Sequence, residues 1–209
     1  IESTILDLTG EAPRILREGD VSGEMISKVI GKPVEHGAVH KPVHNSAAFC
    51  FADAHDLVRV FQGDQPGFVY GRQGTPTSAA LEEKITRMEQ GILTIGFSSG
   101  MAAISATLFS LLRAGDHLVA SSFLFGNTTS LFESFTRMGI DVTFVDATDA
   151  ANVEAALRPE TRMVFVETIA NPCTQVADLA AIGTLCQARG IVYIVDNTIT
   201  TPFLFLPKS

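Results

Sequence analysis

The sequence predicts an α/β fold built on a mostly parallel sheet covered by helices. From about residue 92 onward, short apolar runs rich in β-branched residues alternate with longer segments in which apolar residues recur at helical spacing. The short runs are apolar on both faces, which is typical of parallel strands that helices cover on both sides. Gly115, Gly139 and Gly190 each follow a helical segment, as expected of glycines that end helices.

The elements follow in a regular order along the chain. We expect strands at residues 92–97, 117–121, 141–145, 162–167 and 191–195, and helices at residues 101–113, 128–138, 151–157 and 178–189. Right-handed crossovers should connect the parallel strands. Upstream, residues 78–90 predict an amphipathic helix with Thr77 or Ser78 near its start, and residues 52–61 predict a weaker one.

Two regions of different composition divide the chain. Residues 1–60 hold scattered Gly, Pro and His residues, and we expect them to form an extended arm that packs on a neighbouring subunit. Residues 61–209 should form the sheet-containing domain, incomplete at its C-terminal end. Because the chain opens on Ile, we also expect residues upstream of it.

Composition excludes several classes of protein. A chain of 209 residues with 46% hydrophobic residues is large enough to bury a substantial core, which excludes a disordered or fibrous protein. Its net charge of -8 is unfavourable for binding a phosphate backbone, and no apolar run approaches the ~18 residues of a membrane span. We therefore expect neither a nucleic acid nor a membrane partner. The three cysteines lack metal-type spacing and no export signal is visible, so we expect no metal site and a cytoplasmic protein.

Candidate binding residues follow the predicted strands. Ligands of open parallel sheets bind beyond the carboxyl ends of the strands, where Ser99-Gly100-Met101 enters a helix and could present free N–H groups to an anion. A serine-capped turn without a ligand explains this segment equally well. Phe125, at another helix entry, could stack on a planar ring or simply belong to the core. Asp196 follows the last strand, where a lone Asp often caps a helix.

These three features together match the requirements of one ligand. Pyridoxal phosphate needs an anion site, a stacking surface for its ring, and a carboxylate opposite its ring nitrogen. The ring must stay protonated to act as an electron sink, and an ionised Asp favours the cationic ring through its opposite charge. The convergence of polar strand ends therefore favours a pyridoxal phosphate site.

An ordered set of motifs points to a known family. The set comprises Tyr-Gly-Arg at 70–72, Thr-Pro-Thr at 75–77, Ser-Gly-Met-Ala-Ala-Ile at 99–104, Phe-Gly-Asn-Thr at 125–128, Glu167, Asn-Pro at 171–172, Val-Asp-Asn-Thr at 195–198 and Thr-Pro at 201–202. In this set the sequence resembles the Cys/Met metabolism group of pyridoxal-phosphate enzymes, which includes cystathionine γ-synthase, O-acetylhomoserine sulfhydrylase and methionine γ-lyase. The resemblance implies the large domain of fold-type I enzymes, similar to aspartate aminotransferase.

The resemblance also implies roles for individual residues. Gly100 and Met101 would bind the cofactor phosphate through backbone N–H groups, Phe125 would stack on the pyridine ring, Asp196 would pair with the ring nitrogen, and Asn171 would lie near the ring oxygen. The full implied set is Tyr70, Arg72, Ser99, Gly100, Met101, Phe125, Asn171, Asp196 and Thr198, with Thr198 as a supporting contact.

A second part of the implied site would come from another subunit. Family members are commonly homotetramers, built as dimers of dimers, in which the equivalents of Tyr70 and Arg72 reach the phosphate of the neighbouring subunit. For Arg72, a solvated surface charge is the simple alternative.

Three departures from the family pattern bear on activity. Phe125 stands where most relatives have Tyr, so proton transfer by that hydroxyl would fall to Tyr70 or to the Schiff-base lysine, and Tyr70 and Asp196 become the candidate catalytic residues. Asn127 stands where methionine γ-lyases often have Cys. The lysine that holds the cofactor in relatives follows the ring-pairing Asp at a spacing that places it beyond Ser209, so neither Lys84 nor Lys208 is assigned this role. We expect that lysine and the C-terminal domain in a longer protein.

The resemblance implies a transsulfuration enzyme of methionine and cysteine metabolism. It would act at the γ-carbon of an activated homoserine and use a thiol or sulfide, as O-acetylhomoserine sulfhydrylase and cystathionine γ-synthase do. Two alternatives stay open. One is a lyase that eliminates the γ-substituent of methionine or cystathionine, and the other is a doubly wound module that binds an anion or nucleotide without chemistry.

Overall fold

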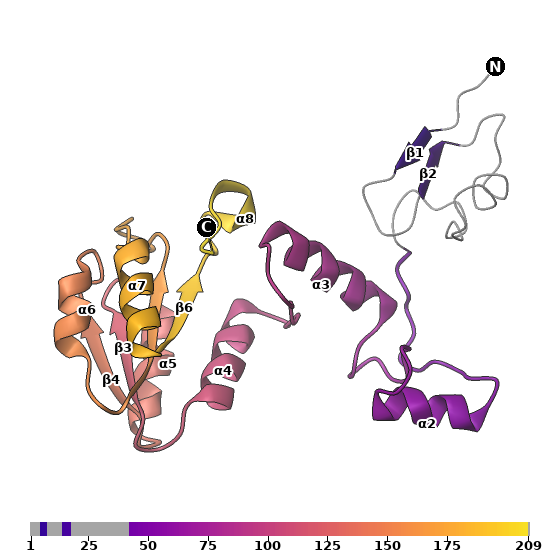
Figure 1. The fold of residues 1–209 in the computed structure, drawn as a ribbon, viewed down its shortest axis with the longest axis horizontal. Coiled ribbons are helices and arrows are strands. Elements are labelled where there is room, and N and C mark those ends of the chain that lie inside the picture. Colours follow the sequence, from indigo (N-terminus) through magenta and orange to yellow (C-terminus); the bar gives the residue numbers. More distant parts are fainter. Residues whose placement is uncertain (1–4, 8–13, 18–41, 209) are drawn as a thin grey trace. The chain divides into compact units, whose positions relative to one another are not determined.

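The computed structural model describes residues 5–7, 14–17 and 42–208 (Figure 1). The chain divides into two compact units, Ile1–Lys84 and Ile85–Ser209.

The second unit is built on a four-stranded parallel sheet. Its strands β3 (His117–Ser121), β4 (Asp141–Val145), β5 (Thr161–Glu167) and β6 (Val192–Asp196) lie in the order β4-β3-β5-β6. In the register between β5 and β6, Glu167 lies opposite Asp196 at the carboxyl end of both strands. The α/β fold with a mostly parallel sheet is therefore confirmed.

Helices cover both faces of this sheet, as Figure 1 shows. Successive residues of a strand point to opposite faces, so neighbouring residues of β5 pack against different helices. On one face, Phe165 of β5 packs with side chains of α4 (Gly100–Leu111) and α5 (Gly126–Thr136), among them Leu108 and Phe132. On the other face, Val164 packs with α6 (Ala150–Ala156) and α7 (Leu179–Arg189). Glu167 is two residues beyond Phe165, so it belongs to the face that α4 and α5 cover.

Short polar residues and glycines fix the helix ends. Asp149 accepts a hydrogen bond from Ala151 N at 2.8 Å at the start of α6, and Asp178 accepts one from Ala181 N at 3.3 Å at the start of α7. Helix α7 ends at Gly190, whose φ of +64° is a left-handed conformation that glycine adopts without steric cost. These signals explain why the predicted boundaries agree closely with the observed ones.

One predicted strand is wrong. Residues 92–97 form neither a helix nor a strand, and Ile92 and Leu93 are 96% and 75% exposed. An apolar, β-branched run becomes a strand only when a neighbouring strand pairs with its backbone. Within the part of the chain that the structure describes, this run has no such neighbour. The short helix α8 (Thr201–Leu204), which follows the last strand, was not predicted.

The first unit contains one helix, most of a second helix and a pair of short strands. Helix α2 (Ala54–Gln62) is capped by Asp53, and helix α3 (Pro76–Met88) begins after Thr75, whose hydroxyl accepts a hydrogen bond from Ser78 N at 3.1 Å. Both helices were predicted. Strands β1 (Ile5–Asp7) and β2 (Arg14–Arg17) pair antiparallel and were not predicted. The arm was predicted at residues 1–60. Apart from β1 and β2, its residues up to 41 lie outside the described part of the chain.

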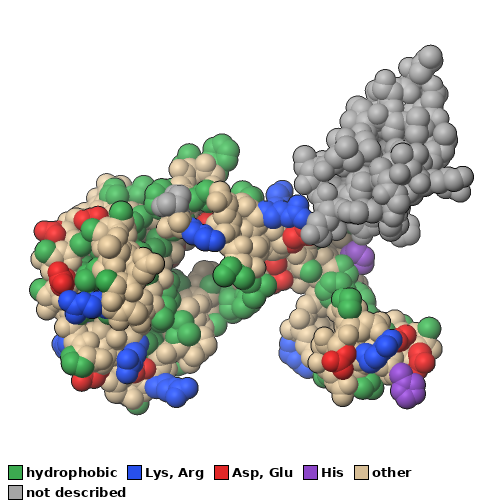
Figure 2. All heavy atoms as spheres, viewed as in Figure 1, with side chains coloured by type: hydrophobic (Ala, Val, Ile, Leu, Met, Phe, Trp, Pro, Cys, Tyr) green, Lys and Arg blue, Asp and Glu red, His purple; other side chains and the backbone are tan. Residues whose placement is uncertain are grey.

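The surface of the described residues bears on the expected partners. None of the described helices is both long and apolar enough to cross a bilayer. Acidic and basic side chains are interspersed over the sheet-containing unit, at the left of Figure 2, without a patch of either sign on the face shown.

Candidate functional site

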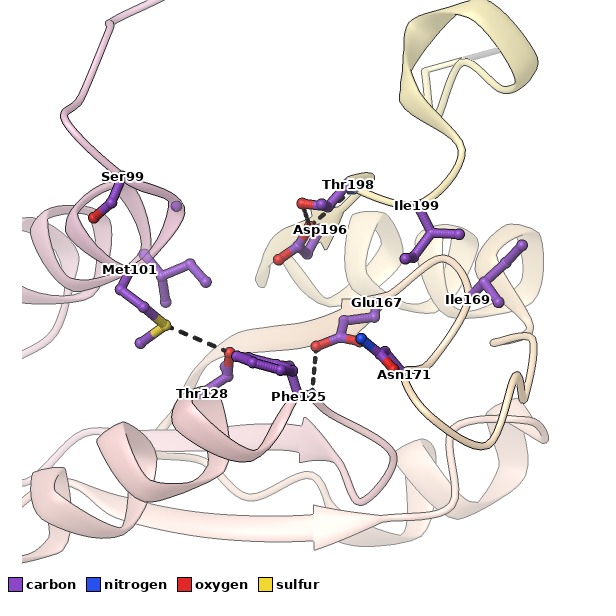
Figure 3. Close-up of a pocket in the computed structure, with 12 residues that line it drawn as sticks. Ser99, Met101, Phe125, Thr128, Glu167, Ile169, Asn171, Asp196, Thr198 and Ile199 are labelled. Atoms are coloured by element: carbon purple, nitrogen blue, oxygen red, sulfur yellow. Dashed lines mark hydrogen bonds between the residues drawn. The ribbon is translucent and has the colours of Figure 1, made fainter.

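A cavity of about 360 Å³ opens at the carboxyl ends of β5 and β6, within the usual size range of small-molecule pockets (Figure 3). It lies beside the first turns of α4 and α5. Its lining residues are Ser99, Gly100, Met101, Ile104, Phe125, Thr128, Glu167, Ile169, Asn171, Asp196, Thr198 and Ile199.

The N-terminus of α4 forms one wall. Ser99 Oγ accepts a hydrogen bond from Ala102 N at 3.1 Å, and this cap leaves the backbone N–H groups of Gly100 and Met101 without a partner inside the helix. The helix dipole adds partial positive charge at the same end. This wall is therefore suited to an anion such as a phosphate group.

The ring of Phe125 forms a second wall. Phe125 lies immediately before the first residue of α5, and its side chain is 46% exposed although the neighbouring Leu124 is buried. Figure 3 shows the ring among the cavity-lining side chains, between Thr128 and Glu167. An aromatic face presented to a cavity in this way can stack on a planar ligand.

Asp196 supplies a carboxylate on the opposite side. Its Oδ1 accepts hydrogen bonds from Thr198 N at 3.0 Å and from the Thr198 hydroxyl. These two bonds fix the orientation of the carboxylate. Thr198 thereby acts on the cavity through Asp196.

Glu167 places a second carboxylate close to Asp196. The Glu167 side chain is only 8% exposed, and its Oε1 accepts a hydrogen bond from Phe125 N at 2.7 Å. Burial raises the pKa of the Glu167 carboxyl and the Asp196 carboxylate raises it further, while hydrogen bonds from the Phe125 and Asn171 backbone oppose the rise. The cavity therefore combines a positive helix end with two carboxylates at its far side.

Comparison with known proteins identifies the family. The sequence profile of the Cys/Met metabolism PLP-dependent enzymes, where PLP is pyridoxal phosphate, matches residues 24–208. The chain belongs to this family. The resemblance drawn from the sequence motifs is thereby confirmed.

Similar enzymes of Cys/Met metabolism differ in their named activities. The chain is 40% identical to an L-methionine gamma-lyase of Fusobacterium nucleatum over 174 residues, which cover 82% of this chain and 44% of the lyase. It is 39% identical to an O-acetyl-L-homoserine sulfhydrylase of Corynebacterium glutamicum, covering 79% of this chain and 38% of that enzyme. The chain thus spans less than half the length of these relatives.

A solved structure of a family member gives the same fold. A Campylobacter jejuni O-acetylhomoserine (thiol)-lyase structure, which contains N'-pyridoxyl-lysine-5'-monophosphate, matches with a TM-score of 0.78 at 29% identity. The match covers 83% of this chain and 43% of that protein. The family uses pyridoxal phosphate, and the described fold corresponds to part of a fold-type I enzyme.

The cavity brings together most of the predicted site residues of this family member. They are Ser99, Gly100, Met101, Phe125, Asn171, Asp196 and Thr198. Tyr70 and Arg72 belong to the first unit, where the Arg72 guanidinium carbon lies 5.0 Å from the centroid of the Tyr70 ring, so the cavity does not test their roles. Lys84 and Lys208, which were not assigned as the lysine that holds the cofactor, are both exposed. Lys208 Nζ donates a hydrogen bond to Gln90 O at 2.9 Å.

Four apolar or hydroxyl side chains and one carboxylate in the cavity were not predicted as site residues. They are Ile104, Thr128, Ile169, Ile199 and Glu167. The position of Glu167 at the end of a strand was visible in the sequence, but its contact with Phe125 depends on the strand order, which the sequence does not state. The three isoleucines could not be recognised as cavity residues from the sequence, because isoleucine is equally common in a buried core.

The groups that line the cavity fit pyridoxal phosphate. The α4 N-terminus suits its phosphate, the exposed Phe125 ring suits its pyridine ring, and the Asp196 carboxylate suits a protonated ring nitrogen. Among the described residues no group of three or more His, Cys, Asp or Glu side chains could hold a metal ion.

Proposed function

We propose that the protein containing this chain is a pyridoxal-phosphate enzyme that replaces the γ-substituent of an activated homoserine with a thiol or sulfide. The observation that carries this proposal is the single cavity in which the α4 N-terminus, the Phe125 ring and the Asp196 carboxylate meet. An ordinary anion site needs only the first of these groups. A phosphorylated, cationic aromatic ligand uses all three.

The phosphate contacts come from the start of α4 in this proposal. The N–H groups of Gly100 and Met101 donate to phosphate oxygens, since both are free of intrahelical bonds. Ser99 contributes through its cap, because the cap sets the direction in which the first turn presents its N–H groups. Arg72 adds positive charge to the phosphate of a neighbouring subunit in the homotetramer that we propose.

The ring contacts come from the loops after three strands. Phe125 packs against one face of the pyridine ring, and Asn171 donates to the ring oxygen. Asp196 holds a proton on the ring nitrogen, and Thr198 keeps the Asp196 carboxylate correctly oriented. When bound, the cofactor withdraws electrons from the substrate and so stabilises the negative charge left when protons leave the α- and β-carbons.

Proton movement requires a group other than Phe125, which has no hydroxyl. We assign this role to Tyr70, whose ring is 43% exposed in the first unit and lies beside the Arg72 guanidinium. A phenolic hydroxyl can both donate and accept a proton. Tyr70 would thus act as an acid or base at the substrate carbons.

γ-Elimination is the second candidate function. It is supported by the 40% identity to an L-methionine gamma-lyase, and it shares the early steps at the α- and β-carbons. Asn127 does not favour it, because methionine γ-lyases often have Cys at this position.

Three assays on the protein expressed from its full natural reading frame separate the candidates. They use O-acetylhomoserine with sulfide, O-succinylhomoserine with cysteine, and methionine alone. Replacement with either activated homoserine is the expected result. Turnover of methionine alone would instead establish the lyase, and a protein that neither binds pyridoxal phosphate nor turns over any of these substrates would favour a non-catalytic binding module.

A further inference from the structure

Glu167 is a buried carboxylate in the cavity wall to which none of the proposed cofactor contacts gives a role. It ends β5, a strand whose residues Val164, Phe165 and Val166 are at most 1% exposed. Glutamate is rarely buried to this extent unless it is paired. Its retention at 8% exposure therefore requires specific partners.

The partners of Glu167 are backbone N–H groups of two cavity-lining residues. Glu167 Oε1 accepts from Phe125 N at 2.7 Å, and the backbone N–H of Asn171 also interacts with this carboxylate. Hydrogen bonds to an ionised acceptor are shorter and about twice as strong as neutral ones. One carboxylate thus holds the residues that line two different walls of the cavity (Figure 3).

The bond to Phe125 links the ring-bearing residue directly to the sheet. The Phe125 carbonyl accepts hydrogen bonds from Thr128 N at 2.9 Å and Thr129 N at 3.2 Å, and these bonds tie it to α5. The Phe125 N–H donates instead to Glu167 on β5. The backbone of Phe125 is therefore fixed from both sides, while its ring is left exposed to the cavity.

A ring that stacks on a ligand is useful only if its plane is held before the ligand arrives. A side chain held in place loses less conformational freedom on binding than a mobile one, and this improves affinity without a new contact. The carbonyl bonds alone orient Phe125 relative to α5. The Glu167 bond orients it relative to β5, and through β5 to the neighbouring β6 that carries Asp196.

We propose that Glu167 is a positioning residue that holds the Phe125 ring in the plane on which the cofactor ring stacks, and that fixes Asn171 through the same carboxylate. This inference rests on the proposed function, because it requires pyridoxal phosphate in the cavity. In this proposal Glu167 acts through Phe125 and Asn171, whose backbone N–H groups it accepts hydrogen bonds from.

The test uses the natural full-length protein freed of cofactor, with two readouts for added pyridoxal phosphate. The dissociation constant is measured by equilibrium dialysis, and the visible circular dichroism per bound cofactor reports how rigidly the cofactor ring is oriented. Glu167→Ala should raise the dissociation constant about tenfold, which corresponds to about 1.4 kcal/mol, and should at least halve the circular dichroism signal. Glu167→Gln keeps an acceptor oxygen for Phe125 N and should retain the signal.

Two further comparisons distinguish positioning from a general loss of structure. In a Phe125→Leu background, which has no ring to orient, Glu167→Ala should raise the dissociation constant by clearly less than tenfold, because only its hold on Asn171 is then lost. Glu133→Ala removes an exposed carboxylate from α5 and should leave both readouts unchanged. If Glu167→Ala does not fold, Glu167→Met replaces it, because Met is similar in length and has no acceptor oxygen.

Either of two results would overturn the inference. One is an unchanged dissociation constant and signal in the Glu167→Ala or Glu167→Met variant, and the other is an equal loss with and without the Phe125 ring. Failure of the unmodified protein to bind pyridoxal phosphate would overturn the proposed function, and this inference with it. That outcome is distinguishable because it is seen before any variant is compared.

Discussion

His117 should stabilise the fold from the end of the sheet opposite the cavity. It begins β3, is 1% exposed, and its ring nitrogens each lie 2.8 Å from a threonine hydroxyl, Nδ1 from Thr161 Oγ1 and Nε2 from Thr143 Oγ1. Thr143 lies on β4 and Thr161 on β5, so one imidazole connects the three strands. The substitution His117→Leu keeps a similar side-chain volume and removes both hydrogen bonds.

The expected loss in the free energy of unfolding depends on the hydrogen bonds that the two threonine hydroxyls keep after the substitution. Each neutral hydrogen bond contributes about 1 kcal/mol, so the free energy of unfolding should fall by about 2 kcal/mol near neutral pH. A larger loss is not expected, because both hydroxyls retain a partner in Arg158, whose backbone N lies 2.7 Å from Thr161 Oγ1 and whose Nη2 lies 3.2 Å from Thr143 Oγ1. Cofactor affinity should not change, since the cavity lies at the carboxyl ends of the strands.

The contribution of His117 should also depend on pH with a defined sign. Burial lowers the pKa of His117 from 6.5, the nearby Arg158 lowers it further, and Asp141 and Glu160 act in the opposite direction. The unfolded chain therefore binds the proton more readily than the folded one. The stability that His117 provides is complete above about pH 6.5 and is lost as the pH falls toward the folded pKa.

Urea unfolding followed by far-ultraviolet circular dichroism, at one protein concentration, measures this effect. The difference between the natural protein and His117→Leu should be about 2 kcal/mol at neutral pH and should narrow on acidification. Taking the difference removes contributions from other titrating groups that both proteins share. The reasoning is refuted if the substitution costs less than about 0.5 kcal/mol, or if the difference widens as the pH falls.

Three other predictions concern the cavity and the cysteines. Asp196→Asn cannot stabilise a cationic ring and should raise the dissociation constant for pyridoxal phosphate about tenfold or more in equilibrium dialysis; an unchanged value would contradict its pairing with the ring nitrogen. Ser99→Ala removes the α4 cap and should lower the free energy of unfolding by about 1 kcal/mol in urea, whereas Ser99→Asp, which can also cap, should not. Cys186 is buried and its pKa is raised to about 11, so a thiol reagent should label it far more slowly than the exposed Cys173; equal rates in peptide mass spectrometry would contradict this.

The sheet and its helices were predictable because their signals are local. Strands β3 and β4 occur at the predicted residues, since each is an apolar run bounded by polar or glycine residues. Helix α7 was predictable from apolar residues that recur at helical spacing and from Gly190, which ends it. Residues 92–97 have the same local signals as a strand, but pairing is a property of neighbours and could not be derived from the run itself.

The site was predictable to the extent that its residues follow strands. Asp196 and Phe125 were found because both follow predicted strands, and the carboxyl ends of parallel strands meet at the edge of the sheet where ligands bind. The contact between Glu167 and Phe125 was missed because it depends on β5 lying between β3 and β6. The cavity in the second unit does not test the roles of Tyr70 and Arg72, which belong to the first unit. That they contact the cofactor phosphate of a neighbouring subunit stays a prediction.

The central claim is that this chain forms a pyridoxal phosphate site whose covalent lysine lies elsewhere in the protein. Reduction of the natural full-length protein with borohydride, followed by peptide mass spectrometry, tests it most directly, because reduction fixes the pyridoxyl group on the lysine that holds it. We predict a pyridoxyl group on a lysine that is none of the five in this chain, namely Lys28, Lys32, Lys41, Lys84 and Lys208. A protein that gains no pyridoxyl group, or gains it on one of these five lysines, would contradict the account.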